Sequence, residues 1–594
     1  MGDTKTEHIV MTPKCKTANS TTLIIERQSL DCLPQTDQRG VHVAGGDHQG
    51  IVINKHATAA NGISRPAHLG LEFRVFLVSA QTKKHTQESR RLQFWFVNSL
   101  PEIEQPHVAQ EFFRELVSPQ EFPRDYVGFI KKIMKLMQHK YPNIKKLEVE
   151  LKQLEEPITL PWRPLSIDET IIGQAVELTA EKVLELIESA YPNPVNIEDM
   201  AKEYNWEADA VTAIMVALEM KGMVKAMGLG AFTRVAHQDT QIKVVKQMPT
   251  MASAKQPTIA IITAQYCEKL AVDSMIENKE TFVRYTTVGT ASSPDSVDGS
   301  IPKVICRFGE SNVYTLGNIG AHRIVCTKLP TVGHTREAMT AAGNTTTRLL
   351  GTFQKVDYVF LVGVGGGVPH YTDYNKHVRL GDVVVSHPTP LNNKYVYIYC
   401  EGAKSNDDGS YHFDTKEYCP SNLGIQEISQ TLKTQAEEST PPWRNYLVEG
   451  LENLGNQSQH DFQRPPEESD KLYMAIGERD IIEVEHPAAP QDTPKRTDCP
   501  KIHLAPVASG RIVSRDDQLR QKFASRFGCL AFDAEMDAVV ESILGNCRDS
   551  FAVIRGIADY KDGARGKEWQ PYAALAAASV VKSIICAMDP PTNV

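Results

Sequence analysis

The chain has 594 residues, the length of roughly three to four ordinary domains. Its 41% hydrophobic and 23% charged residues are typical of a soluble globular protein, and no run of about 18 apolar residues could cross a bilayer. The net charge of -9 disfavours a polyanion as partner of the whole chain. Eleven cysteines without a CxxC pair indicate reduced thiols, not a disulfide framework or zinc site. The N-terminus lacks an apolar h-region, so we expect a cytoplasmic protein.

The first 165 residues divide into two parts by their periodicity. Residues 1–68 mix polar residues and glycine without helical or strand spacing, so we expect a largely disordered segment. An α+β module is predicted over 69–165, with no function assigned to it. Its expected strands are 71–80 and 91–100, and its expected helices are 112–117, 126–138 and 145–156.

The next segment, 166–236, has the layout of a winged helix. Three amphipathic stretches, at 178–190, 195–205 and 207–222, precede two short strands about a glycine turn at 223–235. We expect Asn196 to cap the second helix and Gly222 to end the third. Between Thr170 and Val235 there are ten acidic and five basic residues. Phosphate contacts need cations, so DNA binding is disfavoured, and a protein partner or structural role is favoured over it.

A polar linker, 237–256, leads to a third unit at 257–590. Its β-branched runs alternate with helical spacing, which predicts a mixed, largely parallel α/β sheet with helices on both faces. A long polar excursion at about 402–500 is expected to hold one or two helices, at 425–435 and 443–454. The strands are expected at 258–264, 312–320, 322–329, 358–367 and 382–388, with a helix at 338–353.

The last predicted strand ends in a carboxylate. Residues 551–560 read FAVIRGIADY, and a buried run of this kind places Asp559 at the carboxyl end of a strand. Ligands of open α/β sheets bind beyond the carboxyl ends of the strands, so Asp559 is a candidate for chemistry. An alanine-rich helix is expected at 569–587.

Four separated pieces of the third unit resemble one superfamily in order and spacing. They are 262–268 (ITAQYCE), 360–386 (FLVGVGGGVP to VRLGDVVVS), 506–538 (PVASGRIVSRD to FDAEMDA) and 553–578 (VIRGIADYKDG to WQPYAALAAA). The unit resembles the purine and uridine phosphorylase superfamily. It is most similar to the nucleosidase-like branch found as effector domains in immune receptors of fungi, animals and bacteria.

The resemblance implies cleavage of a purine N-glycosidic bond. Such a reaction needs an acid for the leaving base, a nucleophile at the anomeric carbon and a clamp on the sugar. By its match to the family motifs, Asp559 is the acid at purine N7 and Glu535 binds the ribose hydroxyls. Glu268 stands where hydrolytic members carry a glutamate that activates water. Gly365 and Gly366 lie in the glycine-rich strand end at the substrate.

Two departures from the phosphorolytic members favour hydrolysis. A GDPxR-like motif is absent near the first strand, and Leu361 occupies the position where many hexameric phosphorylases place an arginine. A phosphate dianion needs charge-assisted donors, so the loss of both cations removes a site for inorganic phosphate.

Specificity residues also follow from the resemblance. Backbone groups after the ASG turn read adenine in related nucleosidases, and they map to Val513 and Ser514. Basic residues nearby could supply charge for a 5'-phosphorylated substrate, or they could be solvated loop cations. These residues are Arg511, His334, Arg336, Lys561, Arg565 and Lys567.

The leading hypothesis is a purine nucleoside or nucleotide N-glycosidase, with ATP among the candidate substrates, controlled by its N-terminal modules in a defence or signalling role. A phosphate-dependent purine nucleoside phosphorylase is one alternative, and a catalytically silent nucleotide sensor or winged-helix regulator is another. Neither a metal nor an organic cofactor is needed for this chemistry. The resemblance also implies a homo-oligomer.

Overall fold

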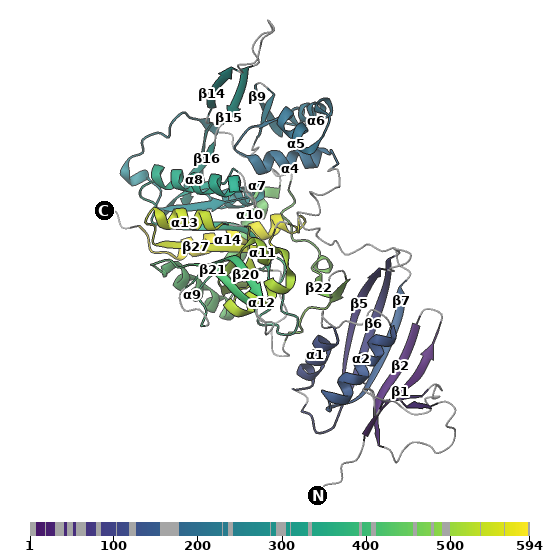
Figure 1. Ribbon diagram of the computed structural model, residues 1–594. Helices are drawn as coiled ribbons and strands as arrows, with labels where there is room; N and C mark the ends of the chain where they lie inside the picture. Colours follow the sequence, from purple (N-terminus) through teal and green to yellow (C-terminus); the bar gives the residue numbers. More distant parts are fainter. Residues whose placement is uncertain are drawn as a thin grey trace. The chain divides into compact units, whose positions relative to one another are not determined.

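A computed structural model describes most of the chain (Figure 1). The described residues are 7–17, 20–29, 41–43, 51–54, 67–78, 85–101, 104–117, 126–154, 177–228, 230–235, 242–285, 287–292, 304–308, 311–330, 336–390, 395–405, 411–455, 460–476, 480–489, 499–534, 536–563 and 565–591. They form two compact units. The first comprises Met1–Arg163, His370–Asn375 and Lys471–Gln491, and the second comprises Pro164–Pro369, Lys376–Asp470 and Asp492–Val594.

The first unit is built on a nine-stranded sheet in the order β22-β23-β5-β6-β7-β2-β1-β4-β3. The expectation of a largely disordered segment at 1–68 is wrong for its described parts, because four of these strands lie there. Strand β2 pairs with β7 and with β1, and Ile9 and Ile25 are buried in the core. The strands are β1 (Glu7–Lys16), β2 (Ser20–Ser29), β3 (Val41–Val43), β4 (Ile51–Asn54), β5 (Leu69–Val78), β6 (His85–Phe96), β7 (Ile144–Leu154), β22 (Leu472–Ile476) and β23 (Asp480–Val484).

Two helices, α1 (Gln105–Leu116) and α2 (Tyr126–His139), cover the sheet of this unit. Phe112 of α1 packs edge-on against Phe94 of β6, with ring centroids 5.7 Å apart. The helix expected at 145–156 is instead strand β7. There Leu147, Val149 and Leu151 are buried in alternation, and period-two burial belongs to a strand.

The hairpin of β22 and β23 comes from the excursion, more than 300 residues along the chain from β5. Strand β23 pairs antiparallel with β5, and Ile482 opposite Val75 is fully buried in the core of this unit. The excursion at 402–500 therefore supplies two strands to the N-terminal sheet, a connection that local sequence cannot reveal.

Residues 178–234 fold as the expected winged helix: α4 (Ala180–Ala190), β8 (Val195–Asn196), α5 (Ile197–Tyr204), α6 (Ala208–Met220), β9 (Val224–Gly228) and β10 (Ala231–Arg234). The Asn196 side chain accepts a hydrogen bond from the Glu198 N–H at 2.9 Å, and this caps α5. After α6, Gly222 has φ 68°, the left-handed conformation of a helix end.

The second unit also holds a 13-stranded mixed sheet, which confirms the expected α/β class. Its main path runs β11-β13-β16-β17-β12-β18-β26-β25-β20-β21, and β27 joins β18 to β19, which pairs with β24. Part of the expected linker, 237–256, is a strand of this sheet, because β11 pairs with β13. The strands are β11 (Ile242–Val244), β12 (Ile259–Thr263), β13 (Glu277–Arg284), β16 (Asn312–Ile319), β17 (His322–Lys328), β18 (Tyr358–Gly367), β19 (Val383–Ser386), β20 (Tyr397–Ser405), β21 (Tyr411–Tyr418), β24 (Ile502–Ala505), β25 (Val507–Ser509), β26 (Ala531–Phe532) and β27 (Ser550–Asp559), with a separate pair β14 (Thr287–Ser292) and β15 (Val304–Phe308).

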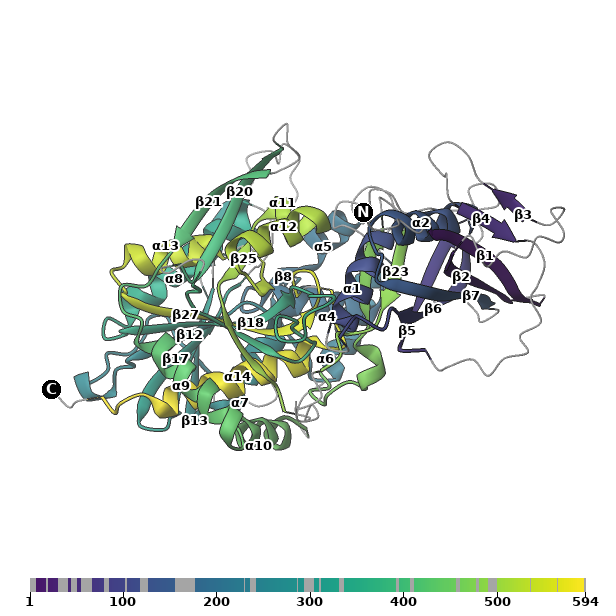
Figure 2. The same cartoon turned by 90° about the horizontal axis from the view of Figure 1, so that it is seen from below.

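Helices lie on both sides of the central strands (Figure 2). Helices α8 and α13 pack together on one side, and α7, α9, α10 and α14 lie on the other. Their bounds are α7 (Tyr266–Met275), α8 (Arg336–Thr352), α9 (Gly424–Glu438), α10 (Trp443–Gly455), α11 (Arg511–Arg515), α12 (Asp517–Phe527), α13 (Asp537–Gly545) and α14 (Gln570–Ala587), with 3-10 turns η4 (Ser253–Lys255) and η5 (Glu467–Ser469).

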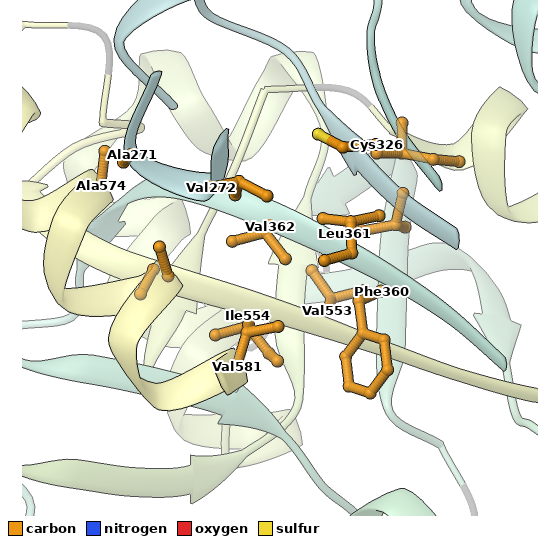
Figure 3. Packing of buried hydrophobic residues seen from close by; sticks show 14 of the residues in the cluster. Ala271, Val272, Cys326, Phe360, Leu361, Val362, Val553, Ile554, Ala574 and Val581 are labelled. Carbon is orange, nitrogen blue, oxygen red and sulfur yellow. The ribbon is translucent and has the colours of Figure 1, made fainter. Parts of the chain in front are cut away.

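Helix α14 packs along β27 and β18 (Figure 3). Val581 of the helix faces Ile554 and Val362, which are buried strand residues. Among the described residues, α14 is the one helix long and apolar enough to cross a membrane, and 83% of its apolar window is buried inside the fold.

The winged helix is anchored to the large sheet by buried polar contacts. At the end of β17, the Lys328 ammonium donates to the backbone carbonyls of Ser189 and Tyr191, each at 2.9 Å. Burial lowers the pKa of Lys328 to about 7. Glu188 accepts from Arg234 at 2.9 Å and lies 3.1 Å from His460 of the excursion. The winged helix and the large sheet therefore share one set of hydrogen bonds.

Replacing Ile482 by alanine tests the shared N-terminal sheet. We expect Ile482→Ala to lower the stability of the first unit by about 2–5 kcal/mol, because it leaves a cavity in a closed core. Hydrogen exchange at peptides that cover β5 and β6, followed with denaturant, reports the stability of this unit. The control Glu485→Ala, at an exposed position beside the hairpin, should change stability by less than about 0.5 kcal/mol. Equal stability of the two variants would contradict the pairing.

Candidate active site

Three parallel strands end at one edge of the large sheet. Strand β12 pairs parallel with β18, and β18 pairs parallel with β27, so their carboxyl ends lie together. Asp559 pairs in register with Gly366. The structure thus brings the ends that carry Glu268, Gly365, Gly366 and Asp559 to one edge, as the sequence motifs require.

Glu268 lies in the first turn of α7, directly after β12, and is 2% exposed. One carboxylate oxygen, Oε2, accepts from the N–H groups of Ala264 and Gln265, each at 2.8 Å. The other, Oε1, accepts from the N–H of Val364 at 2.8 Å. The side chain therefore caps its own helix and ties that helix to β18. Three of its roughly four acceptor positions are occupied by backbone, which leaves one for a water molecule.

Close approach explains the glycines at the end of β18. A Cβ atom on Gly363 would overlap the carboxylate of Glu268, and one on Gly366 would overlap the backbone at Lys561. A Cβ on Gly365 would lie 2.8 Å from the carbonyl oxygen of Phe532. The glycine-rich run is thus needed to pack the strand ends together, whether or not a ligand also approaches there.

Asp559 is held by the loop that follows it. Its Oδ1 accepts from the N–H groups of Lys561 and Gly563, and its Oδ2 accepts from those of Arg565 and Gly566, at 2.7–3.3 Å. The residue is 9% exposed. All of its acceptor positions are engaged by backbone, so this conformation stabilises the ionised form locally.

Opposing influences act on this carboxyl group. Burial raises the pKa of Asp559 above its ordinary value, and the nearby carboxylate of Asp562 raises it further, while the backbone donors lower it. The net direction is upward, towards a carboxylic acid that keeps its proton at higher pH. An upward shift is the direction that a general acid requires.

The cations expected near the loop all lie in ion pairs. Lys561 bonds to Asp517 of α12, and Arg565 lies 3.7 Å from Asp562. Lys567 pairs with Glu185 of the winged helix at 2.8 Å. The loop that holds Asp559 is therefore in contact with the winged-helix domain.

The remaining candidate residues from the sequence differ in their exposure, and two of them lie outside the described part of the chain. Arg511 is exposed at the start of α11, whereas Val513 is fully buried in an apolar cluster with Phe532, and Ser514 is 5% exposed. Arg336 begins α8. Glu535 and His334 lie outside the described residues.

A buried ion pair beneath the site was not expected from the sequence. Arg555 of β27 donates to Asp533 Oδ2 from Nε at 3.1 Å and from Nη2 at 2.8 Å. Tyr397 donates to the other oxygen at 2.9 Å and accepts from the N–H of Met536 at 3.1 Å. This network fixes the segment after β26 against β27. The signal in the sequence was an arginine within the apolar run of 551–558.

Described His, Cys, Asp and Glu residues form no group of three that could hold a metal ion. The described residues of the candidate site are carboxylates, cations and backbone groups.

One family model and one curated relative match parts of the chain. The winged helix-turn-helix domain family matches residues 169–236. Over 282 residues, 47% of this chain, the sequence is 29% identical to a nucleotide-binding leucine-rich repeat (NLR)-like protein of Hyaloscypha variabilis. The aligned region is 26% of that relative, so the chain matches about a quarter of its length.

Two of the solved structures that align with the chain are the following. A 5'-methylthioadenosine/S-adenosylhomocysteine nucleosidase from Neisseria meningitidis aligns over 56% of this chain and 100% of its own, with 15% identity and a TM-score of 0.31. The futalosine hydrolase of Helicobacter pylori aligns over 56% of this chain and 99% of its own, with 13% identity and a TM-score of 0.30.

Substitution of Gly363 tests the packing of the strand ends. We expect Gly363→Ala to destabilise the second unit by about 1–3 kcal/mol, because the added methyl group displaces the buried carboxylate of Glu268. In the control Gly351→Ala the methyl group meets nothing within 4 Å, and alanine is the better helix former, so stability should be unchanged or slightly higher. Thermal unfolding of both variants measures the difference. A Gly363→Ala protein as stable as the control would show that Glu268 is not held as described.

Proposed function

We propose that this chain hydrolyses the N-glycosidic bond of a purine nucleoside or nucleotide. The observation that carries the proposal is Asp559, a buried carboxyl group with a raised pKa at the strand edge that also carries Glu268. The order of motifs that resembles the purine and uridine phosphorylase superfamily supports it. A regulated role in defence or signalling is supported by the similarity to an NLR-like protein.

We assign protonation of the leaving base to Asp559. Departure of a purine leaves negative charge on the base, and protonation of the base neutralises it. In the described conformation four backbone N–H groups occupy the Asp559 carboxylate. A protonated carboxyl group donates one hydrogen bond and accepts fewer, so proton transfer requires part of this loop to release Asp559. We infer that substrate binding rearranges the loop.

We assign activation of the attacking water molecule to Glu268. Its one remaining acceptor position can orient a water molecule and take a proton from it as the water attacks. The three backbone bonds keep the side chain in place, so little reorganisation is needed at the moment of reaction. We assign the ribose contact to Glu535, on the resemblance of its motif to that of the superfamily.

Two observations favour water over phosphate as the nucleophile. The buried cation of β27, Arg555, is committed to Asp533. Leu361 lies fully inside the core of the sheet, at the position where phosphorolytic relatives carry an arginine. A phosphate nucleophile at the position of Leu361 or Arg555 would lack these two residues as charge-assisted donors.

The direct test is base release from adenosine, inosine, AMP and ATP, with and without inorganic phosphate. We expect free ribose or ribose phosphate without added phosphate. Formation of ribose 1-phosphate only when phosphate is present would identify a phosphorylase instead. Purine binding without base release from any of the four would identify a silent sensor.

Asp559→Asn should lower kcat by about 10²–10⁴, because an amide cannot donate the proton in the same way. Its control is Asp549→Asn, at the exposed, opposite end of β27, which should leave kcat unchanged. Equal activities of the two variants in the product assay would remove Asp559 from the mechanism.

The pH profile gives an independent test of the acid. Activity requires the protonated form of Asp559, so kcat should fall as pH rises through the raised pKa of this group. Asp562→Asn removes the like charge that raises this pKa, and the alkaline limb of the profile should move to lower pH. An unmoved or oppositely moved limb would mean that Asp559 is not the titrating acid.

A further inference from the structure

A cluster of charged residues beside Asp559 is not used by the chemistry described above. It consists of Arg520 and Asp517 on α12 and Lys561 and Arg565 on the loop after β27. Asp517 is the common partner. Lys561 bonds to it, Arg520 Nη2 lies 3.5 Å from its Oδ1, and Arg565 contributes to the lowered pKa of its carboxyl group.

Arg520 is the unusual member of this cluster. Its side chain is 4% exposed, and its Nη2 donates to the carbonyl oxygen of Tyr560, the residue after Asp559. Its Nε and Nη1 are buried and make no hydrogen bond to any described residue. Burial of an arginine costs free energy when some of its N–H groups have no acceptor, because the guanidinium group is always charged. We therefore expect a further acceptor beside Arg520.

The cluster carries more positive than negative charge around its shared carboxylate. Three cations, Arg520, Lys561 and Arg565, face Asp517, and Arg565 is also near Asp562. The cations also repel one another, since Arg520 and Arg565 both lower the pKa of Lys561, after burial, which lowers it most. Asp517 begins α12, where the positive end of the helix dipole adds to the field.

Two members of the cluster are reachable from solvent. Asp517 and Lys561 have side-chain exposures of 36% and 22%, whereas Arg520, whose Nη2 lies 3.5 Å from Asp517 Oδ1, is 4% exposed. A guanidinium group and an ammonium group that converge on one anion match the oxygens of a phosphate group. The carboxylate of Asp517 occupies the place that such an anion would take.

We propose that Arg520 and Lys561, with Arg565, form a subsite for a phosphate group of the substrate, and that Asp517 holds this subsite closed until the phosphate replaces it. The subsite rests on the proposed function, which it refines from purine compounds in general to purine nucleotides. Lys561 also donates its N–H to Asp559, so the loop that binds the phosphate is the loop that must release the acid. Phosphate binding therefore couples substrate recognition to the availability of the proton donor.

Binding of inorganic triphosphate to the full-length protein tests the subsite without any glycosidic bond. In isothermal titration, Arg520→Met should raise the Kd at least tenfold, and Arg520→Lys, which keeps the charge, should give a smaller increase. Asp517→Asn should lower the Kd severalfold, because it removes the competing carboxylate while the cations remain. The control Arg526→Met, on the exposed part of the same helix, should leave the Kd within twofold of wild type. Equal effects of Arg520→Met and Arg526→Met, or weaker binding by Asp517→Asn, would overturn the subsite.

Base release separates this inference from the function on which it rests. We expect Arg520→Met to lower kcat/KM for AMP at least tenfold and that for adenosine less than threefold. Equal losses for AMP and adenosine would overturn the subsite and leave the nucleosidase standing. Absence of base release by the wild type, together with triphosphate binding that depends on Arg520, would overturn the nucleosidase and leave the anion site. If phosphate stimulates adenosine cleavage and Arg520→Met abolishes this, the site takes free phosphate, and the substrate-phosphate inference fails.

Discussion

A carboxylate buried at the end of a strand needs a hydrogen-bond donor for each acceptor position, because no bulk water reaches it. Both candidate catalytic carboxylates meet this demand with backbone N–H groups. Glu268 takes its donors from its own helix end and from β18, and Asp559 takes its donors from the loop that follows it. The Glu268 bonds tie the end of β12 to β18, and the Asp559 bonds hold the loop that follows β27. The close approach of Glu268 and of the loop after β27 also explains the run of glycines at the end of β18.

The same bonds set the chemical character of the two groups. Glu268 keeps one acceptor position and stays where it is, which suits a group that orients water. Asp559 has no free position and a raised pKa, so it can give a proton only after the loop moves. In the nearby cluster, Nε and Nη1 of Arg520 have no hydrogen-bond acceptor among the described residues, and we propose that a phosphate group bound there moves the loop. In the mechanism that we propose, backbone hydrogen bonds occupy the Asp559 carboxylate until an anion binds and the loop rearranges.

The winged helix is joined to the large sheet by buried contacts as well as by the chain that connects them. Lys328 donates into the end of α4, and Glu188 joins the winged helix to His460 of the excursion. The exposed pair between Lys567 and Glu185 brings the winged helix to the loop that holds Asp559. Exposed pairs contribute little stability, so this last contact can form and break readily.

The sequence by itself determined the local and ordered features: the three helices and hairpin of the winged helix, the strand that ends at Asp559, and the motif order of the large unit. Periodicity and motif spacing are local properties, so they can be read along the chain. Where polar residues diluted that periodicity, as in β1 and β2, strands were missed. The pairing of β23 with β5, the ion pair of Arg555 with Asp533 and the cluster around Arg520 were decided only by the tertiary structure. Each joins segments far apart in sequence, and burial makes their hydrogen bonds obligatory only after the chain has folded.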